Sequence, residues 1–122
     1  MSTFDGMTRR AKDCLFCKIA AGEIPSKKVY ADDRIYAFHD IAPKAPTHVL
    51  VVPRRHIGRL ADAGAADREL LGDLVAGAAS VARELGLEHY RLVVNNGEGA
   101  GQTVFHLHVH LLGGRAMAWP PG

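Results

Sequence analysis

The sequence contains no apolar run that approaches the roughly 20 residues needed to cross a bilayer. It also lacks a strong charge of either sign. The net charge is +2 with the histidines counted as neutral, which is too small to indicate a surface that binds nucleic acid or an anionic membrane. Residues 1–13 are polar and have no hydrophobic segment of the signal-peptide type. We therefore expect a cytoplasmic protein with neither a nucleic acid nor a membrane as its partner.

Cysteine is scarce, because the chain has only Cys14 and Cys17. In a reducing compartment this spacing favours metal or redox chemistry over a structural disulfide. The pair supplies half of a tetrahedral zinc site, and the sequence offers His48 and His106 to complete it. A reduced buried pair and a redox motif are the alternatives, although no parallel βαβ pattern accompanies the cysteines. Two histidines have no companion feature and are interpreted as surface residues: His56 and His89.

The composition is that of one ordinary domain. Hydrophobic residues make up 48% of the 122 residues and charged residues 23%, both near the globular average. The length is enough for one modest core. We expect a single domain over residues 14–122, preceded by a mobile tail over residues 1–13.

Apolar periodicity predicts two helices and five strands. The short turns between the first strands favour an antiparallel sheet with the helices packed on one side, which is an α+β domain. In the long helix an apolar stripe from Leu70 to Leu85 faces the sheet, and Gly72 and Gly77 would permit close packing. The predicted helices span residues 14–21 and 66–85, and the predicted strands span residues 28–31, 34–41, 48–52, 90–95 and 106–112.

Three histidines at alternate positions, His106, His108 and His110, form the most informative pattern. A period of two predicts a strand with all three imidazoles on one exposed face. Strand rise puts the outer two about 13 Å apart, so one metal ion cannot bind all three and their roles must differ. Imidazoles in such a row suit proton transfer, nucleophilic attack and anion binding, and a solvated histidine row is the alternative. The residues expected to face the core are Phe105, Leu107, Val109 and Leu111.

A glycine-rich loop over residues 95–103 leads into the histidines. Its backbone N–H groups could approach a phosphate, and three side chains could add donors: Asn95, Gln102 and Thr103. It is not a P-loop, and taken alone it could be a plain hairpin turn. Asp40 could accept hydrogen bonds from the vicinal hydroxyls of a ribose, with a solvated turn as the alternative. Apolar residues that could form a slot for a base, or simply pack in the core, are Phe16, Ile19, Ile24, Phe38 and Ile41.

With these motifs the sequence resembles the Hint branch of the histidine-triad superfamily. The central motif is the histidine run itself, and the ending Trp-Pro-Pro-Gly is characteristic of Hint proteins. The resemblance covers roughly residues 14–122. The segments that carry it are HLHVHLL at 106–112, CLFCKIAAGEIP at 14–25, AFHDI at 37–41, APTHVLVVP at 45–53 and GGRAMAWPPG at 113–122.

The resemblance implies a HIT-like fold whose sheet extends across a homodimer. It implies binding of purine nucleoside monophosphates and cleavage of the P–N bond of purine nucleoside 5′-phosphoramidates through a nucleotidyl-histidine. Hydrolysis of dinucleoside polyphosphates and a regulatory, nucleotide-binding interaction protein remain alternatives. No cofactor would be required for catalysis, and a zinc ion would be structural. The tail with Trp119 would lie near an active site, that of its own subunit or of the partner.

The resemblance also implies residue roles. His108 would be the nucleophile, His110 would contact phosphate oxygens, and His106 would support the site together with His48. Thr103 would join the catalytic set, at a position where serine is common. The nucleotide-binding residues would be Phe16, Ile19, Ile24, Phe38, His39, Asp40, Ile41, Asn95, Gly101, Gln102, Thr103, His108 and His110.

Overall fold

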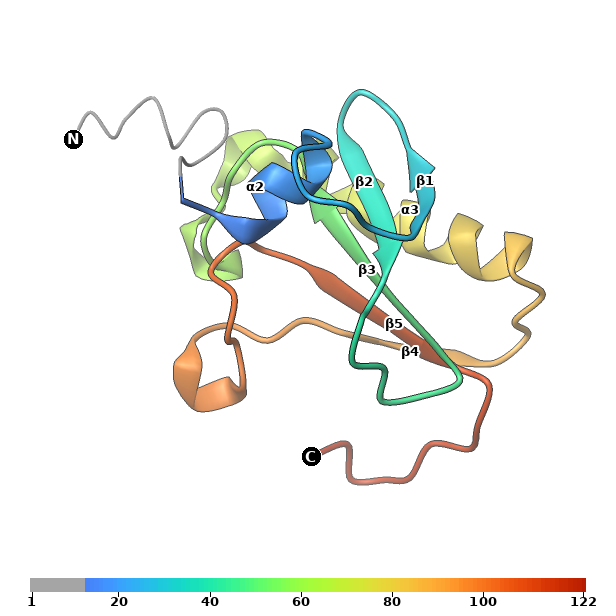
Figure 1. The fold of residues 1–122 in the computed structure, drawn as a ribbon. Coiled ribbons are helices and arrows are strands. Elements are labelled where there is room, and N and C mark those ends of the chain that lie inside the picture. Colours follow the sequence, from blue (N-terminus) through green and yellow to red (C-terminus); the bar gives the residue numbers. More distant parts are fainter. Residues whose placement is uncertain (1–12) are drawn as a thin grey trace.

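The computed structural model describes residues 13–122, which form an α+β fold around one five-stranded antiparallel sheet (Figure 1). The strand order is β1-β2-β3-β5-β4, so the three N-terminal strands meet the two C-terminal strands at the β3–β5 pair. This confirms the predicted fold class. The tail predicted over residues 1–13 lies outside the described residues except for Asp13. The strands are β1 (Lys28–Ala31), β2 (Ile35–His39), β3 (Thr47–Pro53), β4 (Tyr90–Val93) and β5 (Val109–Gly113).

The central strands are apolar at consecutive positions, so both faces of the sheet are buried. Successive side chains point to opposite faces and therefore enter two separate core clusters. One cluster contains the sheet residues Ile35, Ala37, Val49, Val51, Val109 and Leu111. The other contains Tyr36, Phe38, Leu50 and Val52.

The two helices cover opposite faces of the sheet, so the expectation that both pack on one side was wrong. The long helix α3 (Arg68–Glu84) packs on the first cluster through Leu70, Leu74 and Val81. The short helix α2 (Leu15–Ala20) packs on the second cluster through Phe16 and Ile19. Figure 1 shows α2 in front of the sheet and α3 behind it. Within residues 13–122, no helix is long and apolar enough to cross a membrane.

The apolar stripe predicted for the long helix is broader than the face that packs. Val75 remains 53% exposed, and Leu85 follows the last helical residue and is 39% exposed. Of the two glycines, only Gly77 makes a close approach, because a Cβ there would lie 2.5 Å from Cδ1 of Ile35. At Gly72 a Cβ would meet nothing within 4 Å.

The histidine segment is not one continuous strand. β5 begins at Val109, and the chain before it bends away from the sheet. There the N–H of Leu107 donates to the carbonyl of Ile57, 2.6 Å away, outside the sheet. The expectation of three imidazoles on one exposed face is therefore wrong, because His106 is fully buried and His108 is only 7% exposed. Phe105, expected in the core, is 46% exposed.

The two helix glycines provide a matched pair for a stability measurement. Gly72→Ala should raise the free energy of unfolding by about 1 kcal/mol, because alanine loses less backbone entropy in a helix. Gly77→Ala should lose this gain, since the new methyl group would meet the buried Ile35 side chain. Urea denaturation of both variants tests the difference, and equal stabilisation would contradict the proposed close packing.

Candidate active site

Two polar clusters lie near opposite ends of the β3–β5 pair, with His108 between them. The Cys–His cluster consists of Cys14, Cys17, His56 and His106, and the Asp–His cluster consists of Asp40, His48 and His110. In each cluster the candidate ligand atoms lie within 4.8 Å of one another. His108 contacts one member of each cluster. Its ring bonds to the backbone carbonyl of His106, and its ring centroid lies 4.8 Å from that of His110.

The ring of His108 is held in one tautomer. Its Nδ1 lies 2.7 Å from the backbone carbonyl of His106. A carbonyl can only accept, so Nδ1 must carry the hydrogen and Nε2 must present its lone pair. Burial lowers the pKa of His108 below its ordinary value, which keeps the ring neutral at neutral pH. Among residues 13–122, no hydrogen bond to Nε2 occupies that lone pair. The geometry is that of a nucleophile.

A chain of hydrogen bonds sets the tautomer of His110 in the same way. The N–H of Lys44 donates to Nδ1 of His48, 3.0 Å away, so the hydrogen of the neutral His48 ring sits on Nε2. That Nε2 lies 2.9 Å from Nδ1 of His110 and donates to it. The hydrogen of His110 is therefore on its own Nε2.

The Nε2–H of His110 is a buried donor without a hydrogen-bond partner in the described part of the chain. Burial lowers the pKa of His110 to about 4, so the ring is neutral near pH 7. A buried donor without a partner is costly, and an anionic oxygen bound beside His108 would satisfy it.

The Asp–His cluster borders a pocket of about 470 Å³. Asp40 is fixed there because its Oδ1 accepts the N–H of Ala42 at 2.8 Å, while Oδ2 lies 3.5 Å from Nε2 of His48. Ile41 also lines the pocket and is 97% exposed, so its side chain is open to a ligand. The pocket is lined by Lys27, His39, Asp40, Ile41, Pro43, Pro46 and His48.

The predicted slot for a base is brought together only in part. Phe16, Ile19 and Phe38 are buried in one core cluster, and Ile24 packs against it partly buried. The exposed Ile41 is not a member of that cluster. Core packing, which was the alternative for these residues, accounts for the first three.

Phe16 has a further contact with the site. Its ring lies 5.1 Å from the ring of His108, nearly perpendicular to it, and 5.5 Å from that of Phe38. Edge-to-face packing of this kind restricts the plane of the histidine ring.

The glycine-rich loop is fastened by a side chain that was expected to bind a ligand. Gln102 is 1% exposed, and its Oε1 accepts the N–H of Gly97 at 2.8 Å. Its Nε2 donates to the carbonyls of Gly58 and Val104. The prediction of Gln102 as a nucleotide contact is therefore corrected, because both of its donor hydrogens are used within the protein.

The other predicted loop residues remain accessible. Gly97 and Gly101 have φ angles of 92° and 99°, a region that favours glycine, so both are required by the shape of this loop. Thr103 is exposed and Asn95 is partly buried beside Gly101.

The Cys–His cluster has the donor set of a zinc site. Nε2 of His106 donates to the carbonyl of Pro53 at 2.7 Å, so its Nδ1 lone pair faces Sγ of Cys14 at 3.2 Å and Sγ of Cys17 at 3.5 Å. Nδ1 of His56 lies 3.5 Å from Sγ of Cys17. Tetrahedral zinc bonds imply sulfur–nitrogen separations of about 3.6 Å, so the residues fit the ion.

The thiol of Cys14 is already disposed to lose its proton. Its pKa is lowered to about 3, first by the hydrogen bond from the Cys17 side chain and further by His106. A thiolate is the form that binds a metal.

The prediction of His48 as the fourth metal ligand was wrong, and so was the interpretation of His56 as an isolated surface histidine. His48 lies at the start of β3 and His106 binds the last residue of that strand, Pro53, so strand rise separates them by about 16 Å. His56 follows Pro53 and meets His106 where antiparallel β5 is about to begin. Antiparallel pairing of the two strands was the signal that could have identified it.

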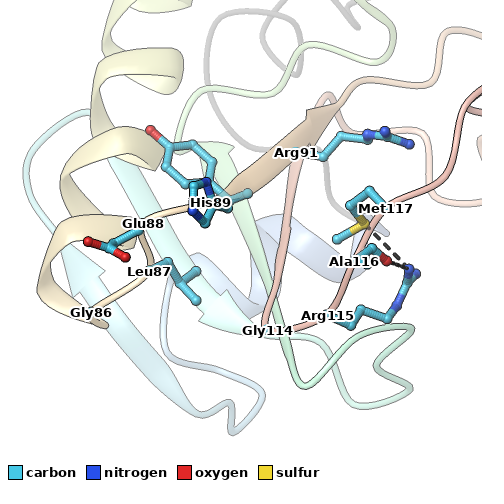
Figure 2. A pocket seen from close by; sticks show the side chains of 10 residues that line it. Gly86, Leu87, Glu88, His89, Arg91, Gly114, Arg115, Ala116 and Met117 are labelled. Carbon is cyan, nitrogen blue, oxygen red and sulfur yellow. Dashed lines mark hydrogen bonds between the residues drawn. The ribbon is translucent and has the colours of Figure 1, made fainter.

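A second cavity, of about 560 Å³, lies between the end of α3, β4 and the C-terminal tail (Figure 2). It is lined by Leu87, His89, Arg91 and Arg115 among others, and by none of the predicted catalytic or nucleotide-binding residues. Trp119, further along the tail, is 80% exposed, with the guanidinium of Arg91 5.8 Å from its ring centre.

Comparison with known proteins gives consistent matches along most of the chain. The HIT domain family matches residues 21–117. An uncharacterized HIT-like protein of Synechococcus elongatus is 50% identical over 113 residues, which cover 92% of this chain and 99% of that protein. A 14 kDa zinc-binding protein of Zea mays is 50% identical over 111 residues, covering 88% and 87%. The solved structure of a HIT family hydrolase from Legionella pneumophila is 52% identical, with a TM-score of 0.88 over 90% of this chain and 100% of that one.

The two histidines give opposite predictions for metal binding. His56→Ala should lower the zinc content of the purified protein, because it removes one of four converging ligands. His48→Ala should leave the zinc content unchanged, since His48 belongs to the Asp–His cluster. Elemental analysis measures both, and loss of zinc in His48→Ala but not in His56→Ala would refute the ligand set.

Proposed function

The chain belongs to the HIT domain family, and we propose that it is a hydrolase of the Hint type that cleaves the P–N bond of purine nucleoside 5′-phosphoramidates. The hydrolase class has the support of the structural neighbours, among them the Legionella pneumophila protein. The substrate is our proposal, and so are the extent of the domain, residues 14–122, and the cytoplasmic location expected from the sequence.

The observation that carries the proposal is the fixed tautomer of His108. In the first step its Nε2 lone pair attacks the α-phosphorus, the P–N bond breaks, and the departing amine takes up a proton from solvent. The ring then bears phosphorus on Nε2 and hydrogen on Nδ1, so it is positively charged. The carbonyl of His106, which accepts the Nδ1–H, stabilises that charge. In the second step water attacks phosphorus and releases a proton to solvent, and the bond to Nε2 breaks to restore the neutral ring.

The developing charge on the phosphoryl oxygens needs donors that are already in position. The buried Nε2–H of His110 is one, because it has no partner among residues 13–122 and lies beside His108. The side chains of Asn95 and Thr103 would supply others, with Gly101 lining the phosphate, because the backbone N–H groups of residues 100–102 already donate to carbonyls within the loop. Removing one preorganised donor of this kind typically costs about 2.7–4 kcal/mol of barrier.

The nucleoside would occupy the pocket beside the Asp–His cluster. The Asp40 carboxylate would accept hydrogen bonds from the ribose hydroxyls, since Oδ2 has no closer donor than His48 at 3.5 Å in the described residues. His39 and the exposed Ile41 would lie against the nucleoside, because both line the same pocket. Phe16, Ile19 and Phe38 pack in the core behind this site, so we propose no base contact for them.

We also propose the homodimer that the sequence analysis implies. β4 pairs only with β5 among the described strands, so its other edge offers unpaired backbone groups. Apolar side chains are exposed in and beside β4, at Tyr90 and Val94. Pairing of two β4 edges would join the sheets and cover these residues.

A zinc ion bound by Cys14, Cys17, His56 and His106 would be structural. The name of the Zea mays relative, a zinc-binding protein, supports this proposal. With four protein ligands the ion would have no open position, so it would cross-link helix α2 to the segment before β5 and would not act on phosphorus.

Removal of the nucleophile is the direct test. His108→Ala should lower kcat for adenosine 5′-phosphoramidate by a factor of about a thousand or more, whereas AMP binding should persist because Asp40 and its pocket are unchanged. His89→Ala, an exposed histidine outside the site, is the matched control. Turnover of His108→Ala near the wild-type rate would refute the mechanism, and faster cleavage of a diadenosine polyphosphate by the wild type would redirect the substrate assignment.

The pH profile provides an independent prediction. Burial lowers the pKa of both His108 and His110, so both rings stay neutral until the pH falls below their ordinary value of 6.5. Protonation then removes the lone pair of the nucleophile, and kcat/KM should fall only on the acid side of 6.5. A profile that already declines between about pH 8 and about pH 7 on acidification would contradict a neutral, buried nucleophile.

A further inference from the structure

One residue belongs to the metal-binding cluster and to the catalytic hydrogen bond at once. The side chain of His106 contributes Nδ1 to the Cys–His cluster, and its backbone carbonyl accepts the Nδ1–H of His108. The ring of His106 is fully buried, and its Nε2 is tied to the carbonyl of Pro53. Whatever fixes the Nδ1 side of this ring therefore also fixes the carbonyl that sets the tautomer of His108.

Helix α2 provides a second connection between the same cluster and the same ring. Cys14 caps this helix, with its sulfur accepting the N–H of Cys17, and the two cysteines bracket Phe16. Phe16 packs edge-on against His108 at 5.1 Å. A six-residue helix is too short to be stable alone, so its position depends on its packing against the sheet and on what holds its ends.

We propose that Cys14, Cys17 and His56 are positioning residues, and that metal bound by the Cys–His cluster holds His108 in its nucleophilic form through the His106 carbonyl and the Phe16 ring. This inference rests on the proposed function and adds a role to a site that would otherwise be only structural. Without the metal, Nδ1 of His106 has only sulfur atoms at 3.2 and 3.5 Å as neighbours in the cluster, and sulfur forms weak hydrogen bonds.

The predicted consequence is a separation of catalysis from binding. If the His106 carbonyl turns away, Nδ1 of His108 loses its acceptor and a fraction of the rings carries the hydrogen on Nε2 instead. Those molecules have no nucleophile. The nucleoside pocket lies at the other end of β3, around Asp40 and His48, and should be unaffected. Loss of metal should therefore lower kcat and leave KM nearly unchanged.

The decisive experiment compares the zinc-loaded protein with the same protein after chelation and after addition of zinc alone. Nitrogen-15 NMR of the histidine rings reports which nitrogen of His108 carries the hydrogen, independently of turnover. We expect a hydrogen on Nδ1 with zinc, a mixture of tautomers without it, and a drop of about tenfold in kcat that zinc restores. Identical ring signals and identical kcat with and without zinc, in protein that remains folded by circular dichroism, would overturn the proposal.

Two pairs of variants keep the test decisive if the metal-free chain does not fold. His56→Ala leaves three ligands, and it should shift the His108 signals and lower kcat, while the exposed His89→Ala should not. In zinc-loaded protein, Phe16→Leu should lower kcat at unchanged zinc content, while Leu15→Ala, an exposed position on the same helix, should not. A rise in KM at constant kcat in Phe16→Leu would instead make Phe16 a base contact and would remove the second connection from the proposal.

This design separates the two ideas. If the loaded protein does not cleave adenosine 5′-phosphoramidate, the proposed function fails, and the NMR comparison still shows whether metal sets the tautomer of His108. If the loaded protein cleaves it and the ring signals ignore the metal, the function stands and the positioning role fails.

Discussion

The hydrogen bond from Nδ1 of His108 to the carbonyl of His106 is the interaction on which the site depends. At 2.7 Å it fixes one tautomer, and it leaves the lone pair of Nε2 without a partner among residues 13–122. A free imidazole exchanges its hydrogen between both nitrogens, whereas here the backbone carbonyl selects the tautomer that the proposed nucleophilic role requires. Burial also lowers the pKa of His108, which keeps the ring neutral.

The antiparallel pairing of β3 with β5 arranges everything else around this bond. Because the strands run in opposite directions, the residues that begin β3 lie beside the middle and end of β5, and the residues that follow β3 lie beside the segment before β5. His48 therefore meets His110 at one end, and His56 meets His106 at the other. The same pairing separates the pocket beside the Asp–His cluster from the Cys–His cluster, with His108 between them.

The sequence was sufficient to predict the fold class, the existence of five strands, and the two cysteines as half of a candidate metal site, because these follow from local periodicity and spacing. It misassigned residues whose role depends on long-range geometry. His48 and His56 are both histidines near β3, and only the strand pairing decides which of them reaches the cysteines. The side chain of Gln102 could donate a hydrogen bond to a phosphate, but it is occupied by the backbone of Gly97 and Val104 nearby and of the distant Gly58. The period of two failed before Val109 because Leu107 pairs outside the sheet, with Ile57, and this draws His106 inward.

The central claim is that His108 forms a covalent bond to phosphorus, and trapping that bond tests it most directly. Rapid acid-free quenching during turnover of adenosine 5′-phosphoramidate, followed by peptide mass spectrometry, should find one adenylate group on the peptide that contains His108. The group should be absent in His108→Gln. In the wild type it accumulates only if the second step, its hydrolysis, limits turnover. An adenylate on a peptide without His108, or one that persists in His108→Gln, would contradict the account.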